Sequence, residues 1–464
     1  MHGEETVNGV EEQVARELAP DPAFVARLKA VRESLQRDAE ARAAALGVPL
    51  RRALVAGSAA RETYLPGQFD IDLFVLFDPS SPRTQLVEWG MALGNALLEH
   101  PEKRFAEHPY LRGQYQGFTT EVVPGYAVER SDRPQTAVDR TPFHLEYLQS
   151  RHTDRTRSDA RLLKKFLKSL GVYGAEVKTG GFSGYLVELL TIESGGFRAV
   201  LERAAKWRIP ERLSPPGPEP SFEDGAALIL SDPVDVHRNV AAALSRQKLG
   251  TFILAAQAYL AQPRREFFFP PPALPWGVAE AKESLAERGT TAVAVLFPVP
   301  DLVPDILFPQ LRKTERSLAS RLTEEGFGVI GTASSAEGGQ GAILVEVQQA
   351  EIGPVGIHDG PMVGIPDTQR FLGKWRSKDV LQGPYVTAEG RLQAESRERA
   401  RGVLERTKDA LPGLAAGRDL REPLARHARV VLLVDALAEP AVLPAAESLC
   451  NKRLPWAGWA PLPP

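Results

Sequence analysis

A single cysteine, Cys450, occurs among 464 residues, and no run of about 20 apolar residues is present. One cysteine forms neither an intramolecular disulfide nor a zinc cluster, so the sequence excludes a disulfide scaffold and fits a reducing compartment. The first ten residues include Glu4 and Glu5, where a signal peptide would be basic and then apolar. We therefore expect a cytoplasmic protein that neither crosses a membrane nor is exported.

The chain also has little net charge, because 56 Lys and Arg residues against 59 Asp and Glu residues leave a net charge of −3. No whole-molecule field attracts a polyanion, so any nucleic-acid surface must be local. Apolar residues make up 43% and charged residues 25%, which is the balance of a folded globular protein. The length predicts two to four domains with well-buried cores.

Hydrophobic patterning divides the chain into three regions, which we place at 1–148, 149–266 and 267–464. The first mixes two kinds of element: helices over 11–46 and 85–98, and strands over 53–55, 71–77, 114–118 and 119–123. The second is predicted to be helical over 161–170, 183–190 and 239–261. After a proline-rich boundary, the third combines strands over 293–297, 329–332 and 343–347 with a helix over 308–325. This last order predicts a helix packed on an antiparallel sheet.

Two short motifs in the first region carry chemistry, Gly57-Ser58 with Arg61 and Asp70-x-Asp72. Side chains two apart in a strand share a face, so the two aspartates project together and suit a divalent cation such as Mg²⁺. Glycine lets the backbone approach phosphate oxygens, Ser58 adds a hydroxyl, and Arg61 adds a bidentate cation. Each motif alone is typical of an ordinary turn. Together they predict a nucleoside triphosphate site, because two facing carboxylates repel each other unless a cation lies between them.

A site for two metal ions needs a third carboxylate on a neighbouring strand, and Glu121 is the best candidate. It lies in the predicted strand that ends at Pro124-Gly125. The alternative, an exposed strand residue without a role, stays open on spacing alone.

Basic residues gather in two predicted helices. On the first, an apolar side faces inward and leaves basic side chains for phosphate, namely Arg157, Arg161, Lys165 and Lys168. On the second, over 308–325, the corresponding residues are Arg312, Lys313 and Arg316. Double-stranded RNA is recognised mostly by shape and backbone, which suits scattered Arg and Lys. A solvated helix face is the alternative for both groups.

Longer segments follow the two motifs. They are Ala137-Val138-Asp139-Arg140-Thr141-Pro142-Phe143-His144 and the stretch from Arg161 through Gly171–Glu176 to Tyr185. Together with the motifs they resemble the archaeal-type (class I) CCA-adding tRNA nucleotidyltransferases. The likeness runs over most of the chain and is densest from Arg52 to Leu190. The later segments are the specific part, since the two motifs alone are shared by the whole polymerase-β-like nucleotidyltransferase superfamily.

The resemblance implies an α+β protein with three parts. Residues 1–148 would form a polymerase-β-like nucleotidyltransferase head with a mixed sheet, and 149–266 a helical central domain that completes the nucleotide pocket. Residues 267–464 would form a ferredoxin-like tRNA-binding body with an inserted tail. The implied activity is template-independent addition and repair of the 3′-terminal CCA of tRNA from CTP and ATP, with release of pyrophosphate. The partners would be the tRNA acceptor end and the two nucleotides, and a homodimer is one option for assembly.

The resemblance also assigns roles to single residues. Gly57, Ser58 and Arg61 would hold the triphosphate, and Asp70, Asp72 and Glu121 would hold two Mg²⁺. The nucleotide pocket would be lined by Thr141, His144, Lys164 and Tyr173. The family commonly has Glu at the position of Asp70 and Asp at that of Glu121, so the two side-chain lengths are exchanged in this chain.

Two other functions stay open on the sequence. One is a poly(A)- or oligoadenylate-forming nucleotidyltransferase, and the other is a non-catalytic RNA-binding protein on the same fold, against which the uncompensated carboxylates argue. A G-x-G-x-x-G match at 326–331 is not a dinucleotide site, because it follows a predicted helix and opens a strand. The eight histidines form no pair at metal-ligand spacing, which disfavours zinc.

Overall fold

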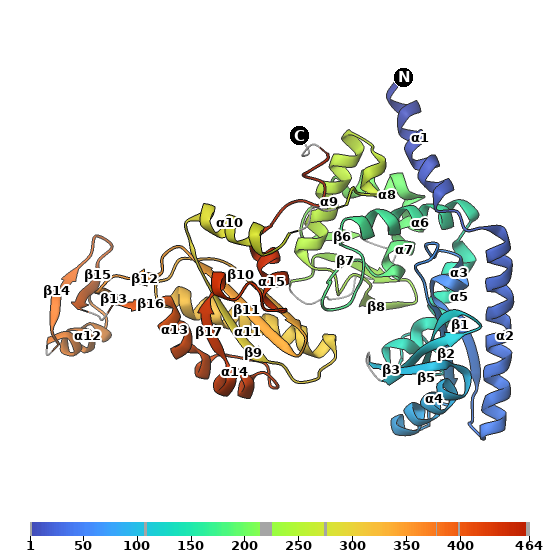
Figure 1. Cartoon of the computed structure of the whole chain (residues 1–464), viewed down its shortest axis with the longest axis horizontal. Coiled ribbons are helices and arrows are strands. Elements are labelled where there is room, and N and C mark those ends of the chain that lie inside the picture. The colour runs from blue at the N-terminus through green and yellow to red at the C-terminus, as the bar shows by residue number, and fades with distance from the viewer. Residues whose placement is uncertain are drawn as a thin grey trace. The chain divides into compact units, whose positions relative to one another are not determined.

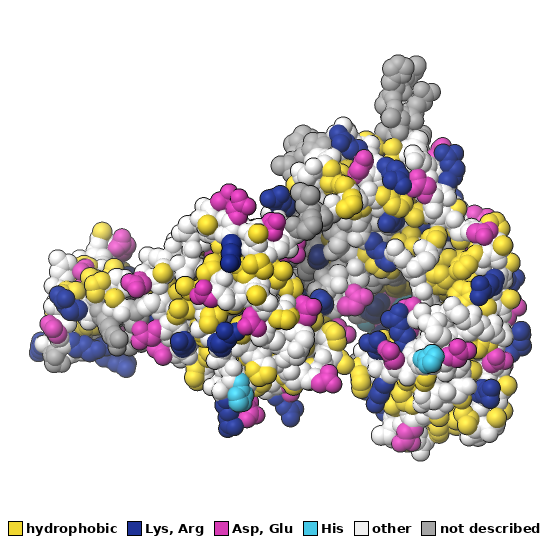
Figure 2. Space-filling view, in the orientation of Figure 1, with side chains coloured by type: hydrophobic (Ala, Val, Ile, Leu, Met, Phe, Trp, Pro, Cys, Tyr) yellow, Lys and Arg dark blue, Asp and Glu magenta, His cyan; other side chains and the backbone are white. Residues whose placement is uncertain are grey.

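The computed structural model describes residues 2–105, 109–213, 225–272, 276–376, 378–397 and 400–460. The chain forms two compact units, one of residues 1–273 with 453–464 and one of residues 274–452 (Figure 1). Basic and acidic side chains are interspersed over the face seen in Figure 2, in keeping with the small net charge. Among the described residues, no helix is both long and apolar enough to cross a membrane.

The first unit contains a mixed five-stranded sheet in the order β1-β2-β5-β4-β3. Its strands are β1 (Arg52–Ala56), β2 (Ile71–Phe77), β3 (Glu99–Phe105), β4 (Pro109–Tyr115) and β5 (Phe118–Tyr126). The central pair β2 and β5 is parallel, and the other neighbours are antiparallel. β3 was not predicted, because this edge strand is exposed along its whole length and has no apolar alternation.

Two helices pack on this sheet, α2 (Pro22–Leu46) against β1 and α4 (Arg83–Leu97) against β4 and β5. A preceding helix, α1 (His2–Glu17), confirms the predicted break before Pro22. Asp21 caps α2 by accepting from the Ala23 amide, and Gly47 ends it with a φ of 68°. The buried residues of α2 recur at the predicted helical spacing and are Leu28, Val31, Leu35, Ala39 and Ala43.

The rest of the first unit is mainly helical around one aromatic core. Its helices are α5 (Thr141–Arg151), α6 (Asp154–Ser169), α7 (Gly184–Ser194), α8 (Phe197–Ala204) and α9 (Arg246–Ala261). A small sheet joins them, formed by β6 (Glu211–Leu213), β7 (Leu228–Asp232) and β8 (Asp235–Asn239). The helix predicted over 239–261 is therefore corrected. It begins only at Arg246, because Asn239 ends β8 and its side chain bonds the backbone of Leu228 and Leu230.

The end of the described chain packs on this helical core. Trp456 is fully buried, with its ring 6.1 Å from that of Phe267, and the ring of Trp459 lies 5.0 Å from the same phenylalanine. Burial of such large aromatic surfaces holds residues 453–460 against the first unit. The predicted third region, 267–464, therefore loses its last residues to the first unit, and its other boundary falls after residue 273.

The second unit confirms the predicted ferredoxin-like order. Its main elements are β9 (Thr291–Pro298), α11 (Pro304–Glu324), β10 (Val329–Glu337), β11 (Gln340–Val347), α13 (Val403–Ala410), α14 (Arg421–His427) and β17 (Arg429–Leu432). The sheet is antiparallel in the order β10-β11-β9-β17, as in a β-α-β-β-α-β fold. α10 (Val278–Arg288) and α15 (Val442–Cys450) add a second apolar layer with their own core. The G-x-G-x-x-G segment opens β10 directly after α11, as expected for a chance match.

An insertion between β11 and α13 forms the predicted tail (Figure 1). The two short strands β12 (Glu351–Ile352) and β16 (Arg401–Gly402) pair at its base. Beyond them, β13 (Val355–Met362), β14 (Val380–Val386) and β15 (Arg391–Arg397) form a three-stranded sheet that contacts α12 (Asp367–Arg376).

Candidate active site

Gly57 begins a tight turn between β1 and the short helix α3 (Gly57–Arg61). Its φ is 68°, a conformation that favours glycine. A Cβ atom on Gly57 would lie 1.8 Å from Oδ2 of Asp72, so only glycine leaves room for this carboxylate. The predicted turn and the predicted Asp-x-Asp motif are thus in direct contact, with Ser58 as the next residue of the turn.

Asp70, Asp72 and Glu121, which we call the carboxylate cluster, lie at one end of the two central strands. Asp72 is paired in register with Glu121 on the parallel strand β5, and Asp70 directly precedes β2. Burial, followed by the charges of Glu121 and Asp70, raises the pKa of Asp72 to about 7. Burial and the charge of Asp70 also raise the pKa of Glu121. Three acids this close together are a donor set that fits a cation.

One arginine that the sequence analysis missed compensates part of this charge. Arg112 on β4 is the register partner of Glu121, and its Nη2 lies 3.1 Å from both carboxylate oxygens of Asp70. Its Nε is 3.9 Å from Oε1 of Glu121. The described part of the chain contains no group of three His, Cys, Asp or Glu side chains arranged to hold a metal ion. Asp70 is paired with Arg112 in this structure, and the predicted metal site of the three carboxylates stays a prediction.

Arg61 is paired as well, and its partner was also not predicted. Its Nε and Nη2 donate to the two carboxylate oxygens of Glu188 on α7, at 2.7 and 2.9 Å. The hydroxyl of Thr63 and Nε2 of His152 donate to the same carboxylate, at 2.9 and 3.0 Å. We call these four residues the Glu188 cluster. The pair uses two of the five guanidinium N–H groups, and the expected contact of Arg61 with phosphate stays a prediction.

Burial alone would raise the pKa of Glu188, which is fully buried. The charge of Arg61 and the bonds from His152 and Arg61 outweigh this effect and hold the pKa far below its ordinary value. Glu188 is therefore a buried carboxylate whose charge is fully matched by donors.

Three more cations bond carbonyl groups of α3 and of the turn that follows it. Arg32, Arg161 and Lys164 donate to the carbonyls of Ala59, Glu62 and Thr63, at 2.8, 2.7 and 2.8 Å. Cations at the carboxyl end of a helix stabilise it. These three hydrogen bonds hold α3 in position, although the helix spans only five residues.

Two of these contacts bear on the sequence prediction, and one of them corrects it. Arg161 is only 8% exposed, so the phosphate contact predicted for it is wrong. Arg161 and Lys164 are three residues apart and share one face of α6, and this face packs against the turn at Glu62 and Thr63. Lys164 is buried as well, and burial lowers its pKa to about 8. Its contact is with a backbone carbonyl, so its predicted contact with the nucleotide stays a prediction.

Tyr173 lies beside these groups and faces two lysines. The ammonium nitrogens of Lys164 and Lys168 are 5.8 and 5.4 Å from the centre of its ring. Burial, followed by the charge of Glu188, raises the pKa of Tyr173, and the charges of Arg61 and Asp72 also act on it. Tyr173 thus lies within electrostatic reach of both clusters.

His144 belongs to a separate polar group. Its Nε2 lies 2.8 Å from Oδ2 of Asp232, and its ring stacks on Tyr185 at 4.0 Å. The hydroxyl of Tyr185 and Nη1 of Arg238 donate to the same fully buried carboxylate, at 2.9 and 2.8 Å. Thr141, the first residue of α5, begins the helix that carries His144.

The remaining basic residues of α6 are more accessible than Arg161. Arg157 is paired with Asp154 at 2.8 Å, and Lys168 donates to the side chain of Gln68 at 3.2 Å. The ammonium of Lys165 lies 4.5 Å from the ring centre of Phe269.

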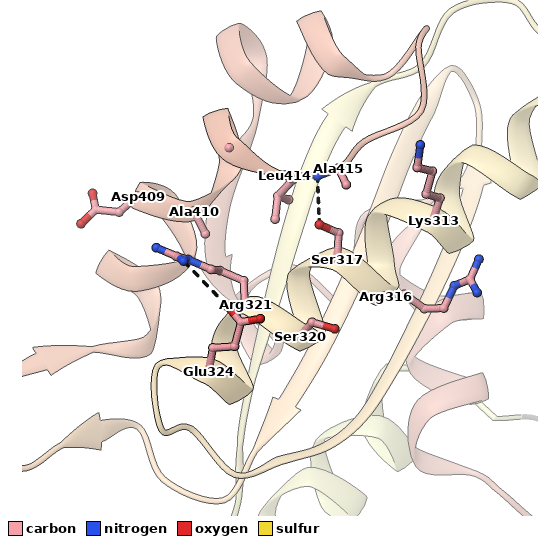
Figure 3. Close-up of a pocket in the computed structure, with 11 residues that line it drawn as sticks. Lys313, Arg316, Ser317, Ser320, Arg321, Glu324, Asp409, Ala410, Leu414 and Ala415 are labelled. Carbon is pink, nitrogen blue, oxygen red and sulfur yellow. Dashed lines mark hydrogen bonds and ion pairs between the residues drawn. The ribbon is translucent and has the colours of Figure 1, made fainter. Parts of the chain in front are cut away.

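In the second unit, one face of α11 lines a polar cavity of about 690 Å³ (Figure 3). The cavity is bounded on its other side by the end of α13 and the following turn. Lys313 and Arg316 lie at one end, and Glu324 and Asp409 at the other. Ser317 accepts a hydrogen bond from the Ala415 amide at 2.9 Å. Arg312 lies on the same helix and accepts, through its carbonyl, a bond from Nε of Arg316.

Comparison with known proteins adds to this geometry. Three family models match: a nucleotidyltransferase domain over 45–144, the second domain of tRNA nucleotidyltransferase over 158–269, and the C-terminal domain of CCA-adding enzymes over 288–432. The CCA-adding enzyme of Haloarcula marismortui is 40% identical over 392 residues, 81% of this chain and 83% of that protein. That of Halobacterium salinarum is 37% identical over 439 residues, 94% and 96% of the two chains. A solved cytoplasmic RNA terminal U-transferase aligns with a TM-score of 0.43 and 14% identity, over 58% of this chain and 100% of that one.

The mixed-sheet region is thus a nucleotidyltransferase domain, a class whose members generally use a divalent metal ion. The relatives narrow the class, because their likeness extends through the helical region and the ferredoxin-like body as well. The chain belongs to the family of CCA-adding enzymes and is a tRNA nucleotidyltransferase, as the sequence resemblance predicted. Enzymes of this family act on tRNA with CTP and ATP.

Proposed function

We propose that this chain completes or repairs the 3′ end of tRNA by adding C, C and A from CTP and ATP, without a nucleic-acid template and with release of pyrophosphate. The observation that carries the proposal is the contact between Gly57 and Asp72, which places a backbone turn suited to phosphate against an uncompensated carboxylate. A triphosphate bound along this turn would meet Asp72 and Glu121 on adjacent strands.

The carboxylate cluster would hold two Mg²⁺ ions. When bound, such ions lower the pKa of an attacking hydroxyl and neutralise the departing pyrophosphate. The chain itself supplies the oxygen ligands at one end of the two central strands, where strand pairing fixes Asp72 and Glu121 next to each other. Asp70 would exchange its pairing with Arg112 for a place in this ligand set, which the longer Arg112 side chain permits because it is partly exposed.

The nucleotide itself would be bound between the turn and the helices that follow the head. Ser58 would donate its hydroxyl to phosphate, and Tyr173 and Thr141 would line the pocket. His144 would act as a polar contact rather than as a general base, because its Nε2 is already paired with the buried carboxylate of Asp232. Lys164 would act mainly through its hold on Thr63.

The RNA would be bound by its backbone. Lys313 and Arg316, at the basic end of the α11 cavity, and Arg312 beside them suit phosphate contacts that do not read sequence. In the first unit, Arg157, Lys165 and Lys168 suit the same role, whereas the buried Arg161 does not. A homodimer and a cytoplasmic location stay predictions.

Incubation of the protein with a tRNA that lacks its last three nucleotides tests the proposal. With CTP and ATP together, three nucleotides are expected and extension stops after A. With CTP alone two are expected, and with ATP alone none, whereas a tRNA ending in CC accepts one A. Long tails from ATP alone would instead identify a poly(A)-forming enzyme, and no incorporation under any condition would leave a non-catalytic RNA-binding protein.

A further inference from the structure

We infer that Glu188 is a positioning residue for the triphosphate turn: it accepts two of the five guanidinium N–H groups of Arg61, so that the three others, two on Nη1 and one on Nη2, are held in a fixed direction for a phosphate. The inference rests on the proposed function and deepens it. It assigns a role in nucleotide binding to a residue that lies outside the turn and on a different helix.

The geometry of the pair fixes the orientation of the guanidinium plane. Nε and Nη2 of Arg61 bond Oε2 and Oε1 of Glu188, at 2.7 and 2.9 Å, and neither bond uses Nη1. A two-bond contact of this kind fixes direction as well as distance. The Arg61 side chain is 9% exposed and that of Glu188 is not exposed, so water does not compete for these bonds.

The other donors to Glu188 tie the turn to the helical region. Thr63 lies two residues beyond Arg61 on the same turn, whereas His152 lies between α5 and α6. Lys164 of α6 in turn bonds the carbonyl of Thr63. One carboxylate therefore joins residues of the matched nucleotidyltransferase domain to a helix of the matched second domain.

The charges of both Glu188 and Asp72 act on Arg61. Without Glu188, the buried arginine would have Asp72 as its main acidic neighbour, and its fork could turn toward the position where a metal ion is expected. Glu188 thus keeps Arg61 beside the turn and leaves Asp72 available.

The stability of the fold alone does not explain why the Arg61–Glu188 ion pair is present. A buried ion pair often adds little to folding compared with apolar residues of similar size, because both charges must leave water. Glu188 lies between Val187 and Leu189 in an otherwise apolar stretch of α7, where a leucine would match its neighbours. The position of the acid is better explained by the arginine that it orients.

A double-mutant cycle on nucleotide binding tests the inference. The variants are Glu188→Gln, Arg61→Lys and the double substitution, and equilibrium dialysis measures the Kd of CTP with Mg²⁺ and no tRNA. Each single variant is expected to weaken binding about tenfold, and the double variant hardly more than either single one. Glu188→Asp, which keeps the charge, is expected to recover part of the loss.

The control is Glu193→Gln on the same helix, which is exposed and is expected to leave CTP binding unchanged. Independent effects, which would make the double variant about a hundredfold weaker, would overturn the inference. So would a Glu188→Gln protein that melts at a lower temperature but binds CTP like the wild type, since that is the behaviour of a purely structural residue.

Two further outcomes of the experiment still test the inference. If Glu188→Gln does not fold, the same cycle is run with Glu188→Asp, and additivity there has the same meaning. If the wild type binds CTP but does not extend tRNA, CCA addition is refuted, whereas the coupling between Arg61 and Glu188 is still measured.

Discussion

Two carboxylates act on the same arginine and have opposite electrostatic states. Glu188 is fully buried and receives bonds from Arg61, Thr63 and His152, and its pKa lies far below the ordinary value. Asp72 is half-buried beside Gly57, and burial with the charges of Glu121 and Asp70 raises its pKa to about 7. The charge of Arg61 acts on both acids, but the guanidinium group of Arg61 is hydrogen-bonded to Glu188.

The difference separates a positioning site from a binding site within one small region. A carboxylate whose donors are all supplied by the protein has no capacity left for a ligand. A carboxylate crowded by others is held in an unfavourable charge state, and a bound cation relieves it. The Glu188 cluster is therefore complete without a ligand, whereas the carboxylate cluster gains from one.

The largest effect is expected for Asp72→Asn. This substitution keeps the shape of the side chain but removes the charge nearest the turn, and nucleotide incorporation should fall at least about 1000-fold, or about 4 kcal/mol. Binding of tRNA should change little, because no RNA contact is assigned to this residue. Primer-extension rates and tRNA filter binding measure the two quantities.

Asp78→Asn is the matched control for this prediction. Asp78 directly follows the opposite end of β2 and is ion-paired with Arg51, so its loss should leave incorporation within about twofold. Wild-type turnover in Asp72→Asn would remove the metal role of the carboxylate cluster.

Gly57→Ala should have the next largest effect. An added Cβ meets both a φ of 68° and the Asp72 carboxylate at 1.8 Å, whereas Gly47, also at 68°, has no atom within 4 Å of such a Cβ. Gly47→Ala should cost about 1 kcal/mol of unfolding free energy, and Gly57→Ala about 1–3 kcal/mol more. Chemical unfolding of the two variants isolates the contact. Equal losses would show that Asp72 moves away from the turn at no cost.

The sequence predicted one of the two clusters because its signal is local. Gly57-Ser58 and Asp70-x-Asp72 lie within 16 consecutive residues, and strand periodicity alone places both aspartates on one face. Glu121 was the candidate third carboxylate because a two-metal site needs one on a neighbouring strand, and the family resemblance added to this; the structure pairs it in register with Asp72 on β5. The pairs Arg112–Asp70 and Arg61–Glu188 were not predicted, because each depends on packing between segments that are distant in the sequence. Arg112 is 42 residues from Asp70, and Glu188 is 127 residues from Arg61.

The fold was predicted where the apolar pattern is regular and missed where the contacts are long-range. The β-α-β-β order of the second unit and the break before α2 follow from periodicity and from Pro22. The packing of Trp456 on the first unit and the burial of Arg161 could not be predicted in this way. The composition of a chain end and of a basic helix face is typical of solvent-exposed segments. One retrospective signal for Glu188 does exist, namely a single acid inside the apolar run of α7.

The two carboxylates should also give opposite pH dependences of stability. Asp72 ionises near pH 7 in the folded protein and near 3.8 when unfolded, so the stability it contributes at low pH is lost as the pH rises between these values. Because its side chain is partly exposed, we expect a loss of about 2 kcal/mol relative to Asp72→Asn. Glu188 has a lowered pKa, so its contribution is present above its unfolded pKa of about 4.5 and is lost as the pH falls further.

Unfolding curves of the wild type, Asp72→Asn and Glu188→Gln between pH 2 and 8, without metal, measure these slopes. Added Mg²⁺ should abolish the loss in the wild type and have little effect on Asp72→Asn. Parallel curves for the wild type and Asp72→Asn would mean that Asp72 is not under strain in the free protein.

The smallest expected effect concerns Arg112, the partner of Asp70. Arg112 bonds Asp70 at 3.1 Å but its side chain is 41% exposed, so it compensates the carboxylate cluster only weakly, in contrast to Arg61 and Glu188. Because an incoming metal ion must displace Arg112 from Asp70, Arg112→Gln should tighten binding of Mn²⁺ about threefold, which is less than 1 kcal/mol. Titration followed by Mn²⁺ electron paramagnetic resonance, without nucleotide, measures the Kd. Arg51→Gln at the far end of the sheet should leave it unchanged. Weaker binding in Arg112→Gln would instead mean that the arginine holds Asp70 in place for the ion, and the contrast between the two arginines would disappear.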